Sequence, residues 1–301
     1  MDHEWDRRYA YTAYGLNIES QLPLPGLVRR RDGRSDVTIR FGGVPPSLST
    51  PFGPTGTWQA EPNRLLVRAA RVARYLVSDG REIRIERGHD GTDDDVRTFL
   101  LSSAMAAVLH QRNILALHAS AIRTGRGAVL FMGRSGCGRS TLLTALVGRG
   151  YAMLADDISG VVTDGEPRVV PAVPMTHLWP DAAARLRQTV NESDRQRASV
   201  DKYAVPVKRF CGAPVALCAV YVLRPHNRPD LSIGPLGPVQ GVAALTRYTY
   251  RKKSMWAMGL GRQHFAAVTT VARAAALRLV TRPTFPFLID RLADLIEEDL
   301  R

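Results

Sequence analysis

The feature that most constrains this chain is a glycine-rich segment, Gly-Arg-Ser-Gly-Cys-Gly-Arg-Ser-Thr, at residues 133–141. An apolar run at residues 128–132 precedes it, and a stretch typical of a helix follows at residues 139–149. Glycines at such a turn permit backbone conformations that a Cβ atom hinders, so successive N–H groups can turn inward around an anion. A helix that begins there adds its positive dipole end and its free N–H donors. The segment predicts a strand, a phosphate-binding loop and a helix; the alternative is a glycine-rich turn with no ligand.

The spacing of this segment fits G-x-x-x-x-G-K-[ST] at every fixed position except the lysine, which here is Arg139. Ser140 or Thr141 would offer a hydroxyl to Mg²⁺. Only four of the 41 basic residues are lysines, so the composition favours arginine wherever either is tolerated, and we expect Arg139 to bind phosphate. Whether it supports transfer depends on its placement, because a displacement of about 1 Å can cost on the order of a hundredfold in rate. The candidate nucleotide-binding residues are Gly133, Arg134, Ser135, Gly136, Cys137, Gly138, Arg139, Ser140 and Thr141.

Two adjacent carboxylates, Asp156 and Asp157, follow the next apolar run at residues 151–155. Ligands of α/β sheets bind at the carboxyl ends of the strands, so we expect this pair to lie beside the loop. One acid can hold Mg²⁺, directly or through water, and the other can accept the proton of an attacking hydroxyl. The alternative is a helix cap or turn. His118 precedes the loop strand, and a lone histidine there is more often structural than catalytic.

The rest of the chain indicates an α/β protein in two parts, residues 1–95 and 96–301. The first part has Pro- and Gly-rich turns between runs of period-two alternation, which predict short antiparallel strands at residues 36–41, 64–68 and 81–86. From Asp93 the apolar spacing becomes helical. Residues 128–155 predict a βαβ unit. A strand is predicted at residues 216–223, and helices at residues 238–248, 266–279 and 288–300.

Charge and cysteine content narrow the class of function. Residues 1–95 hold 14 basic and 14 acidic residues, so the net charge of +13 lies in residues 96–301, where an anionic ligand is expected. No nucleic-acid recognition motif is present, and the run at residues 251–253 suits a solvated patch. The three cysteines form no CxxC pair. With an acidic start and no apolar run of about 18 residues, we expect a cytoplasmic protein with no membrane partner. Whether the protein forms a homo-oligomer stays open.

Three segments together resemble the HPr serine kinase/phosphorylase family: His-Ala-Ser-Ala-Ile at residues 118–122, the glycine-rich loop, and Gly-Tyr-Ala-Met-Leu-Ala-Asp-Asp at residues 150–157. Residues 14–25, 178–181 and 219–223 are similar to the HPr-kinase-related proteins found beside lasso-peptide biosynthesis genes. The resemblance implies a P-loop nucleotide domain, 96–301, of the phosphoenolpyruvate-carboxykinase type, preceded by the smaller β-rich region 1–95. It also implies ATP- and Mg²⁺-dependent phosphorylation of a serine on a peptide or small protein, of the lasso-peptide precursor type.

The resemblance also implies roles for individual residues. His118 would orient the reacting groups, and the loop with Arg139 would bind the triphosphate. Asp156 is favoured as the base, and Asp157, with Ser140, as the metal contact. Two other functions stay open. One is a catalytically weak nucleotide-binding partner in a biosynthetic complex, suggested by Arg139 and by the lack of a Glu-x-Arg-Gly segment after the aspartates. The other is a true HPr serine kinase.

Overall fold

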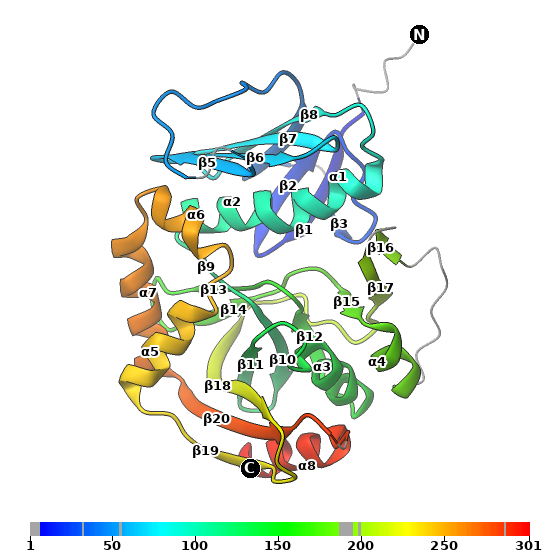
Figure 1. Cartoon of the computed structure of the whole chain (residues 1–301), viewed down its shortest axis with the longest axis vertical. Helices are drawn as coiled ribbons and strands as arrows, with labels where there is room; N and C mark the ends of the chain where they lie inside the picture. Colours follow the sequence, from blue (N-terminus) through cyan, green and yellow to red (C-terminus); the bar gives the residue numbers. More distant parts are fainter. Residues whose placement is uncertain (1–6, 32, 54–55, 187–194, 198–199, 286) are drawn as a thin grey trace. The chain divides into compact units, whose positions relative to one another are not determined.

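The structure is a computed structural model that describes residues 7–31, 33–53, 56–186, 195–197, 200–285 and 287–301 (Figure 1). The chain divides into two compact units, one formed by the residues up to Ala116 with Arg251–Phe265, the other by Leu117–Tyr250 with Ala266–Arg301. The sequence predicted a transition at about residue 95, but the helices that follow that position belong to the first unit. The Tyr75 hydroxyl, for example, donates a hydrogen bond to the carbonyl of Val96 over 3.0 Å. The first unit is therefore longer than expected and is discontinuous in sequence.

In the described part of the chain, the first unit is built on an eight-stranded sheet with the order β3-β1-β2-β4-β8-β7-β6-β5. Its strands are β1 (Tyr9–Ala13), β2 (Leu16–Ser20), β3 (Val28–Arg29), β4 (Val37–Phe41), β5 (Trp58–Glu61), β6 (Arg64–Ala69), β7 (Ala73–Ser78) and β8 (Glu82–Arg87). The three predicted strands are confirmed as β4, β6 and β8. Their direction is not uniformly antiparallel, because β4 pairs parallel with both β2 and β8. Alternation of apolar residues reveals a buried face but carries no information on strand direction.

The first helix of the first unit begins where the sequence predicted. Thr92 caps α1 (Asp93–Phe99) by accepting a hydrogen bond from the Asp95 N–H, and three aspartates occupy the first turn. A π-helical turn (Leu100–Ala104) follows, then α2 (Met105–Gln111), and later in the chain α6 (Lys252–Ala257). Strand β9 (Leu115–Leu117) spans the residues at which the division between the units falls.

The second unit contains the predicted βαβ arrangement, formed by β11 (Gly127–Gly133), α3 (Arg139–Gly148) and β12 (Ala152–Ala155). The two strands are not neighbours, because β10 (Ala119–Thr124) lies between them and pairs antiparallel with each. On its other side β11 pairs parallel with β18 (Val215–His226), which pairs parallel with β20 (Ala276–Pro283). The carboxyl ends of β11, β18 and β20 therefore meet at one edge of the sheet, where the glycine-rich loop begins.

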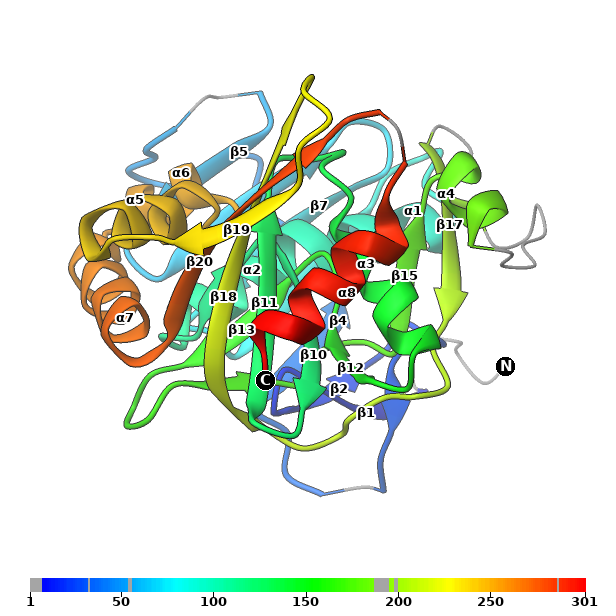
Figure 2. The same cartoon turned by 90° about the horizontal axis from the view of Figure 1, so that it is seen from below.

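Helix α3 and the terminal helix α8 (Ile289–Asp299) pack on this sheet (Figure 2). The core between them includes Phe131, Leu142, Tyr221 and Ile296, each at most 1% exposed. The remaining elements are β13 (Ser159–Val162), β14 (Arg168–Val170), β15 (Met175–Leu178), α4 (Pro180–Arg185), β16 (Arg195–Arg197), β17 (Val200–Pro206), β19 (Ser232–Pro235), α5 (Pro238–Arg247) and α7 (Gly261–Ala274).

One predicted helix is only partly correct. Residues 266–279 were expected to be helical, but α7 ends at Ala274 and β20 begins at Ala276. This segment is a strand because it pairs with β18, which lies more than fifty residues earlier in the chain. Helix propensity depends on local sequence and contains no information about such a distant partner. The predicted helices at residues 238–248 and 288–300 are confirmed as α5 and α8. Within the described residues, every helix is too short or too polar to span a bilayer.

Candidate functional site

The glycine-rich loop joins β11 to α3 and adopts a backbone that needs glycine at two positions. Gly136 has φ +78° and Gly138 has φ +93°, both in the left-handed region. Gly138 is also the residue from which α3 starts, so the free N–H groups of the first helical turn lie at the end of the loop. Arg134, Ser135 and Gly136 are exposed. The predicted order of strand, loop and helix is confirmed.

Three of the candidate loop residues, Cys137, Arg139 and Thr141, have buried side chains. Cys137 is 1% exposed, so only its backbone can face a ligand, and burial raises the pKa of its thiol. Thr141 is 9% exposed. Ser140 is more accessible, and its Oγ donates a hydrogen bond of 3.0 Å to Asp156 Oδ1. Of the two candidate hydroxyls, Ser140 is therefore the one placed beside a carboxylate.

Asp156 is a buried carboxylate, 8% exposed, at the end of β12. Its Oδ1 accepts hydrogen bonds from Ser120 Oγ at 2.6 Å and from Ser140 Oγ at 3.0 Å. Its Oδ2 accepts from Thr176 Oγ1 at 2.8 Å and from the His177 N–H at 3.1 Å. Donors from β10, α3 and β15 therefore fix the orientation of this carboxylate.

Asp157 lies next to His118. The residue has φ +65°, a left-handed conformation that aspartate tolerates better than most residues, and its side chain is 34% exposed. Its Oδ1 is 3.1 Å from His118 Nε2. The His118 ring also makes an edge contact with Tyr250, with ring centroids 5.6 Å apart. The structure thus brings His118, Asp156 and Asp157 together beside Arg139 and Ser140, at the start of α3.

Arg139 contacts His118 rather than extending along the loop. It is 8% exposed; Nη2 lies 2.6 Å from His118 Nε2, and Nη1 donates to the His118 carbonyl oxygen. The planar fork of the guanidinium permits this paired contact, which the single ammonium of lysine does not. A neutral imidazole nitrogen is either a donor or an acceptor. Nε2 therefore either accepts from Arg139 or donates to Asp157.

Arg282, on β20, is a site residue that the sequence did not predict. Its Nε donates to the Cys137 carbonyl oxygen over 2.9 Å, and a Cβ atom at Gly138 would lie 2.9 Å from Arg282 Nη2. Burial lowers the pKa of the guanidinium, which nonetheless stays charged. The residue was missed because β20 was taken as the end of a helix. The signal that could have found it is an arginine at the carboxyl end of a strand parallel to the loop strand.

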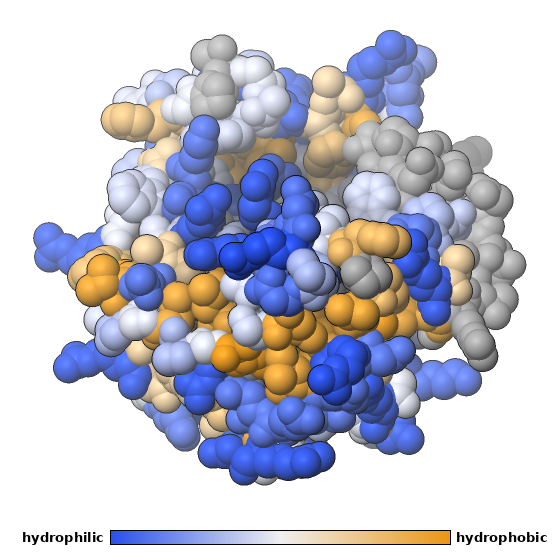
Figure 3. Space-filling model, turned by 60° about the horizontal axis from the view of Figure 1, so that its bottom comes forward, coloured by the Kyte–Doolittle hydropathy of each residue, from blue (hydrophilic) through white to orange (hydrophobic). Residues whose placement is uncertain are grey.

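A pocket of about 230 Å³ adjoins the loop and includes aromatic side chains. Its lining includes Trp179, Phe285 and Phe287 beside Ser135, Gly138 and Arg282. Trp179 is 43% exposed and Phe285 is 82% exposed. The hydropathy of one face of the molecule, where hydrophobic residues form a band between hydrophilic ones, is shown in Figure 3. The Arg185 guanidinium lies 4.8 Å from the Phe287 ring centroid. A lining that combines backbone amides, cations and aromatic rings suits a ligand with phosphates and a flat ring.

The donor set near the loop fits Mg²⁺ in the form that accompanies a nucleotide. Among the described residues, no group of three or more His, Cys, Asp or Glu side chains is arranged to hold a metal ion alone. Mg²⁺ in phosphoryl-transfer sites usually takes one or two carboxylates plus phosphate oxygens and water. The Ser140 hydroxyl and the Asp156 carboxylate, 3.0 Å apart, are hard oxygen donors of that kind.

No model of a known protein family matches this chain, and no curated protein matches its sequence. Among solved structures, the chain is similar to the Hpr(Ser) kinase/phosphatase from Coxiella burnetii. The alignment has 12% identity and a TM-score of 0.30, and it covers 62% of this chain and 90% of that chain. Because the TM-score is this low, the structural similarity gives no support to the function proposed below.

Proposed function

We propose that this protein is an ATP- and Mg²⁺-dependent kinase that phosphorylates a serine hydroxyl on a peptide or small protein. The observation that carries the proposal is the hydrogen bond from Ser140 to Asp156 at the end of a glycine-rich strand-to-helix loop, with Asp157 next in sequence. P-loop enzymes hold Mg²⁺ with a loop serine or threonine and an aspartate at a strand end, and Ser140 with Asp156 is a pair of this kind. The nucleotide phosphates would lie against the backbone N–H groups of residues 136–141.

We assign the two aspartates in the reverse of the division that the family resemblance favoured. Asp156 accepts four hydrogen bonds, one of them from Ser140, so it suits the metal and is poorly placed to take a proton. Asp157 is the more exposed of the two and adjoins His118. Asp157 is therefore the proposed base, and Ser140 with Asp156 the proposed metal contacts.

The proposed step is a direct transfer. When bound, ATP supplies the phosphoryl group, and the reaction forms an O–P bond to serine and breaks the bond to the bridging oxygen. Asp157 accepts the serine proton. While His118 Nε2 accepts a hydrogen bond from Arg139, this nitrogen carries no proton to donate to Asp157. The Asp157 carboxylate can then accept a proton from the substrate serine. Arg282 supplies positive charge at the loop that a Walker-type lysine would otherwise provide.

The substrate class rests on the resemblance to lasso-peptide-associated kinases, with HPr-type proteins as the alternative. The test is incubation with Mg-ATP and a panel of serine-containing peptides and HPr, read as a mass gain of one phosphate. Asp157→Asn should abolish the gain and leave ATP binding intact, whereas Asp156→Asn should weaken Mg-ATP binding. Asp164→Asn is the control, because Asp164 is an exposed carboxylate of the same unit. Full turnover in Asp157→Asn contradicts the assignment of the base.

The contact between Arg139 and His118 favours a second candidate, a nucleotide-binding protein with little turnover. In this arrangement the loop cation is held by His118 rather than directed to phosphate alone. ATP would then raise the melting temperature while no peptide gains phosphate. Arg139→Lys should restore transfer if the guanidinium is what limits it. Absence of any nucleotide-induced stabilisation would contradict both candidates.

A further inference from the structure

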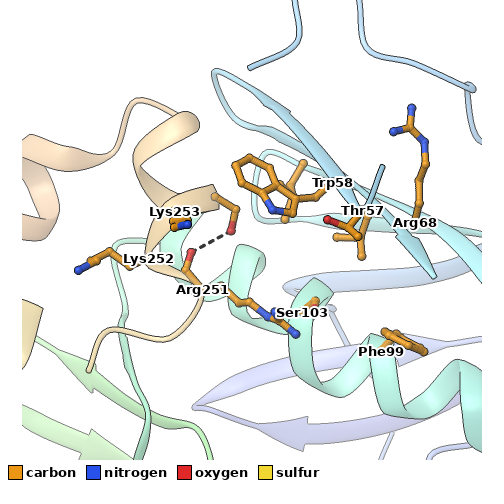
Figure 4. Close-up of a pocket in the computed structure, with 11 residues that line it drawn as sticks. Thr57, Trp58, Arg68, Phe99, Ser103, Arg251, Lys252 and Lys253 are labelled. Atoms are coloured by element: carbon orange, nitrogen blue, oxygen red, sulfur yellow. Dashed lines mark hydrogen bonds between the residues drawn. The ribbon is translucent and has the colours of Figure 1, made fainter. Parts of the chain in front are cut away.

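A second pocket lies within the first unit, shares no lining residue with the pocket beside the glycine-rich loop, and measures about 490 Å³ (Figure 4). Its apolar wall comes from the sheet and from α1, through Trp58, Leu65, Val67 and Phe99. Ser103 and Ser254, both buried, also line it. This volume falls in the range of sites that bind small ligands or a few residues of a peptide.

The rim of this pocket is positively charged. Arg68, Arg251, Lys252 and Lys253 line it, and within the described residues no acidic side chain does. Figure 4 shows Arg251 reaching toward Ser103, while Lys252 extends away from Trp58. The cationic lining therefore comes from two separate segments of the chain, and an anionic ligand would complement its charge.

Two features of the backbone mark the same pocket independently of charge. A π-helical turn, which contains Ser103, lies between α1 and α2. Such turns are less stable than a regular helix and occur frequently at functional sites. Arg251 has φ +51°, a left-handed conformation that is unfavourable for a residue with a Cβ atom. The Ser254 hydroxyl holds that conformation by donating to the Arg251 carbonyl oxygen over 2.9 Å, drawn as a dashed line in Figure 4.

We propose that this pocket binds an acidic peptide segment, with an apolar side chain against Trp58 and carboxylates at Arg251 and Lys253. A peptide suits the pocket better than a single small anion, because the lining combines several cations with an apolar surface formed by Trp58, Leu65, Val67 and Phe99. Recognition would be through side chains rather than by strand addition. The edge strand β5 already exchanges hydrogen bonds at Ala60 with Phe52. The proposal does not depend on nucleotide binding or on transfer.

The test measures binding of a fluorescein-labelled hexapeptide that alternates glutamate with leucine, by fluorescence anisotropy on the full chain. The matched probe replaces every glutamate by glutamine. We expect the glutamate peptide to bind and the glutamine peptide to bind at least tenfold more weakly. Binding of the glutamate peptide should weaken further as NaCl is raised, because the ion pairs are partly exposed.

The decisive variant is the double substitution Arg251→Asn with Lys253→Gln. Asparagine tolerates the left-handed backbone and glutamine keeps much of the lysine stem, so the fold is preserved while two charges are lost. The dissociation constant should rise about tenfold. Arg262→Gln is the control, because Arg262 is an exposed arginine of the same unit that does not line the pocket. Trp58→Leu should also weaken binding; thermal melting by circular dichroism checks that each variant folds.

Several outcomes would overturn the proposal. Equal affinity for the glutamate and glutamine peptides would show that the pocket does not recognise the negative charge of the peptide. An equal loss in Arg262→Gln would show a diffuse effect of net charge. Stronger displacement by inorganic pyrophosphate or by a short DNA duplex than by unlabelled peptide would assign the pocket to a small anion or to nucleic acid. Loss of peptide binding in Asp157→Asn would place the peptide at the proposed transfer site instead of this pocket.

Discussion

At the scale of single residues, Asp156 is the group on which the site depends most. Its carboxylate accepts four hydrogen bonds in a buried position. In Asp156→Asn one acceptor oxygen becomes a donor amide that faces other donors, so the free energy of unfolding should fall by about 1–3 kcal/mol. Urea denaturation followed by circular dichroism measures this. Asp164→Asn, at an exposed position, should change stability by less than about 0.5 kcal/mol. An unchanged midpoint for Asp156→Asn would show that the four bonds are not formed in solution.

Two loop glycines have left-handed backbone conformations, and substituting each of them separates two contributions to the free energy of unfolding: backbone strain and steric overlap. A Cβ atom at Gly136 meets nothing within 4 Å, whereas one at Gly138 lies 2.9 Å from Arg282 Nη2. Gly136→Ala should therefore cost about 1–2 kcal/mol from backbone conformation alone. Gly138→Ala should cost more, because Arg282 must also move. Equal losses in thermal unfolding of the two variants would mean that Arg282 does not sit against the loop.

His264 makes folding stability depend on pH. Burial, and secondarily the charge of Lys252, lowers the pKa of His264 below its ordinary value of 6.5. The unfolded chain takes up a proton near pH 6.5 that the folded protein takes up only at lower pH. The stabilising contribution is therefore complete above pH 6.5 and declines as the pH falls, by at most about 1.4 kcal/mol per pH unit. Urea titrations between pH 7.5 and 5.5 should show this slope, and His264→Gln should flatten it.

At the scale of elements, one arginine joins the loop helix to the terminal helix. Arg149, directly after α3, donates to Asp294 at 2.7 Å and to Glu297 at 2.8 Å on α8. Partial burial opposes its charge, but these two hydrogen bonds raise the pKa of Arg149 overall. Arg149→Met should keep the packing of the stem and lose about 1–2 kcal/mol of stability. The loss should shrink in 1 M NaCl, where the wild-type ion pairs are screened. A loss that is independent of salt would point to packing instead.

Elements were predictable where their pattern is local. About ten residues of sequence are enough to predict three of them: the helix start at the aspartates after Thr92, the glycine-rich loop, and the helix at residues 288–300. The parallel pairing of β4 was not predictable, because alternation fixes the buried face and leaves the direction open. The strand β20 was not predictable either, since its partner β18 lies far away in the chain.

At the scale of the whole molecule, the proposed function predicts where a nucleotide acts. A ligand that binds only the folded state stabilises it by about 2.7 kcal/mol at a hundred times its dissociation constant. With Mg-ATP, hydrogen exchange should slow in the glycine-rich loop, α3 and β12, all in the second unit. The acidic hexapeptide should instead slow exchange in β5 and the π-helical turn of the first unit. Protection of the first unit by Mg-ATP alone would contradict the separation of the two sites.

The sequence by itself determined the loop, its adjacent serine and the pair of aspartates, because glycine conformations and strand-to-helix order depend on neighbouring residues. The tertiary structure decided which groups meet at that loop. Arg282 reaches the Cys137 carbonyl only because β20 pairs with β18, and Arg139 turns to His118 only because β10 lies beside β11. It also decided that Ser140 meets Asp156, which reverses the roles proposed for the two acids. Contacts between distant segments depend on strand pairing and burial, which no local pattern encodes.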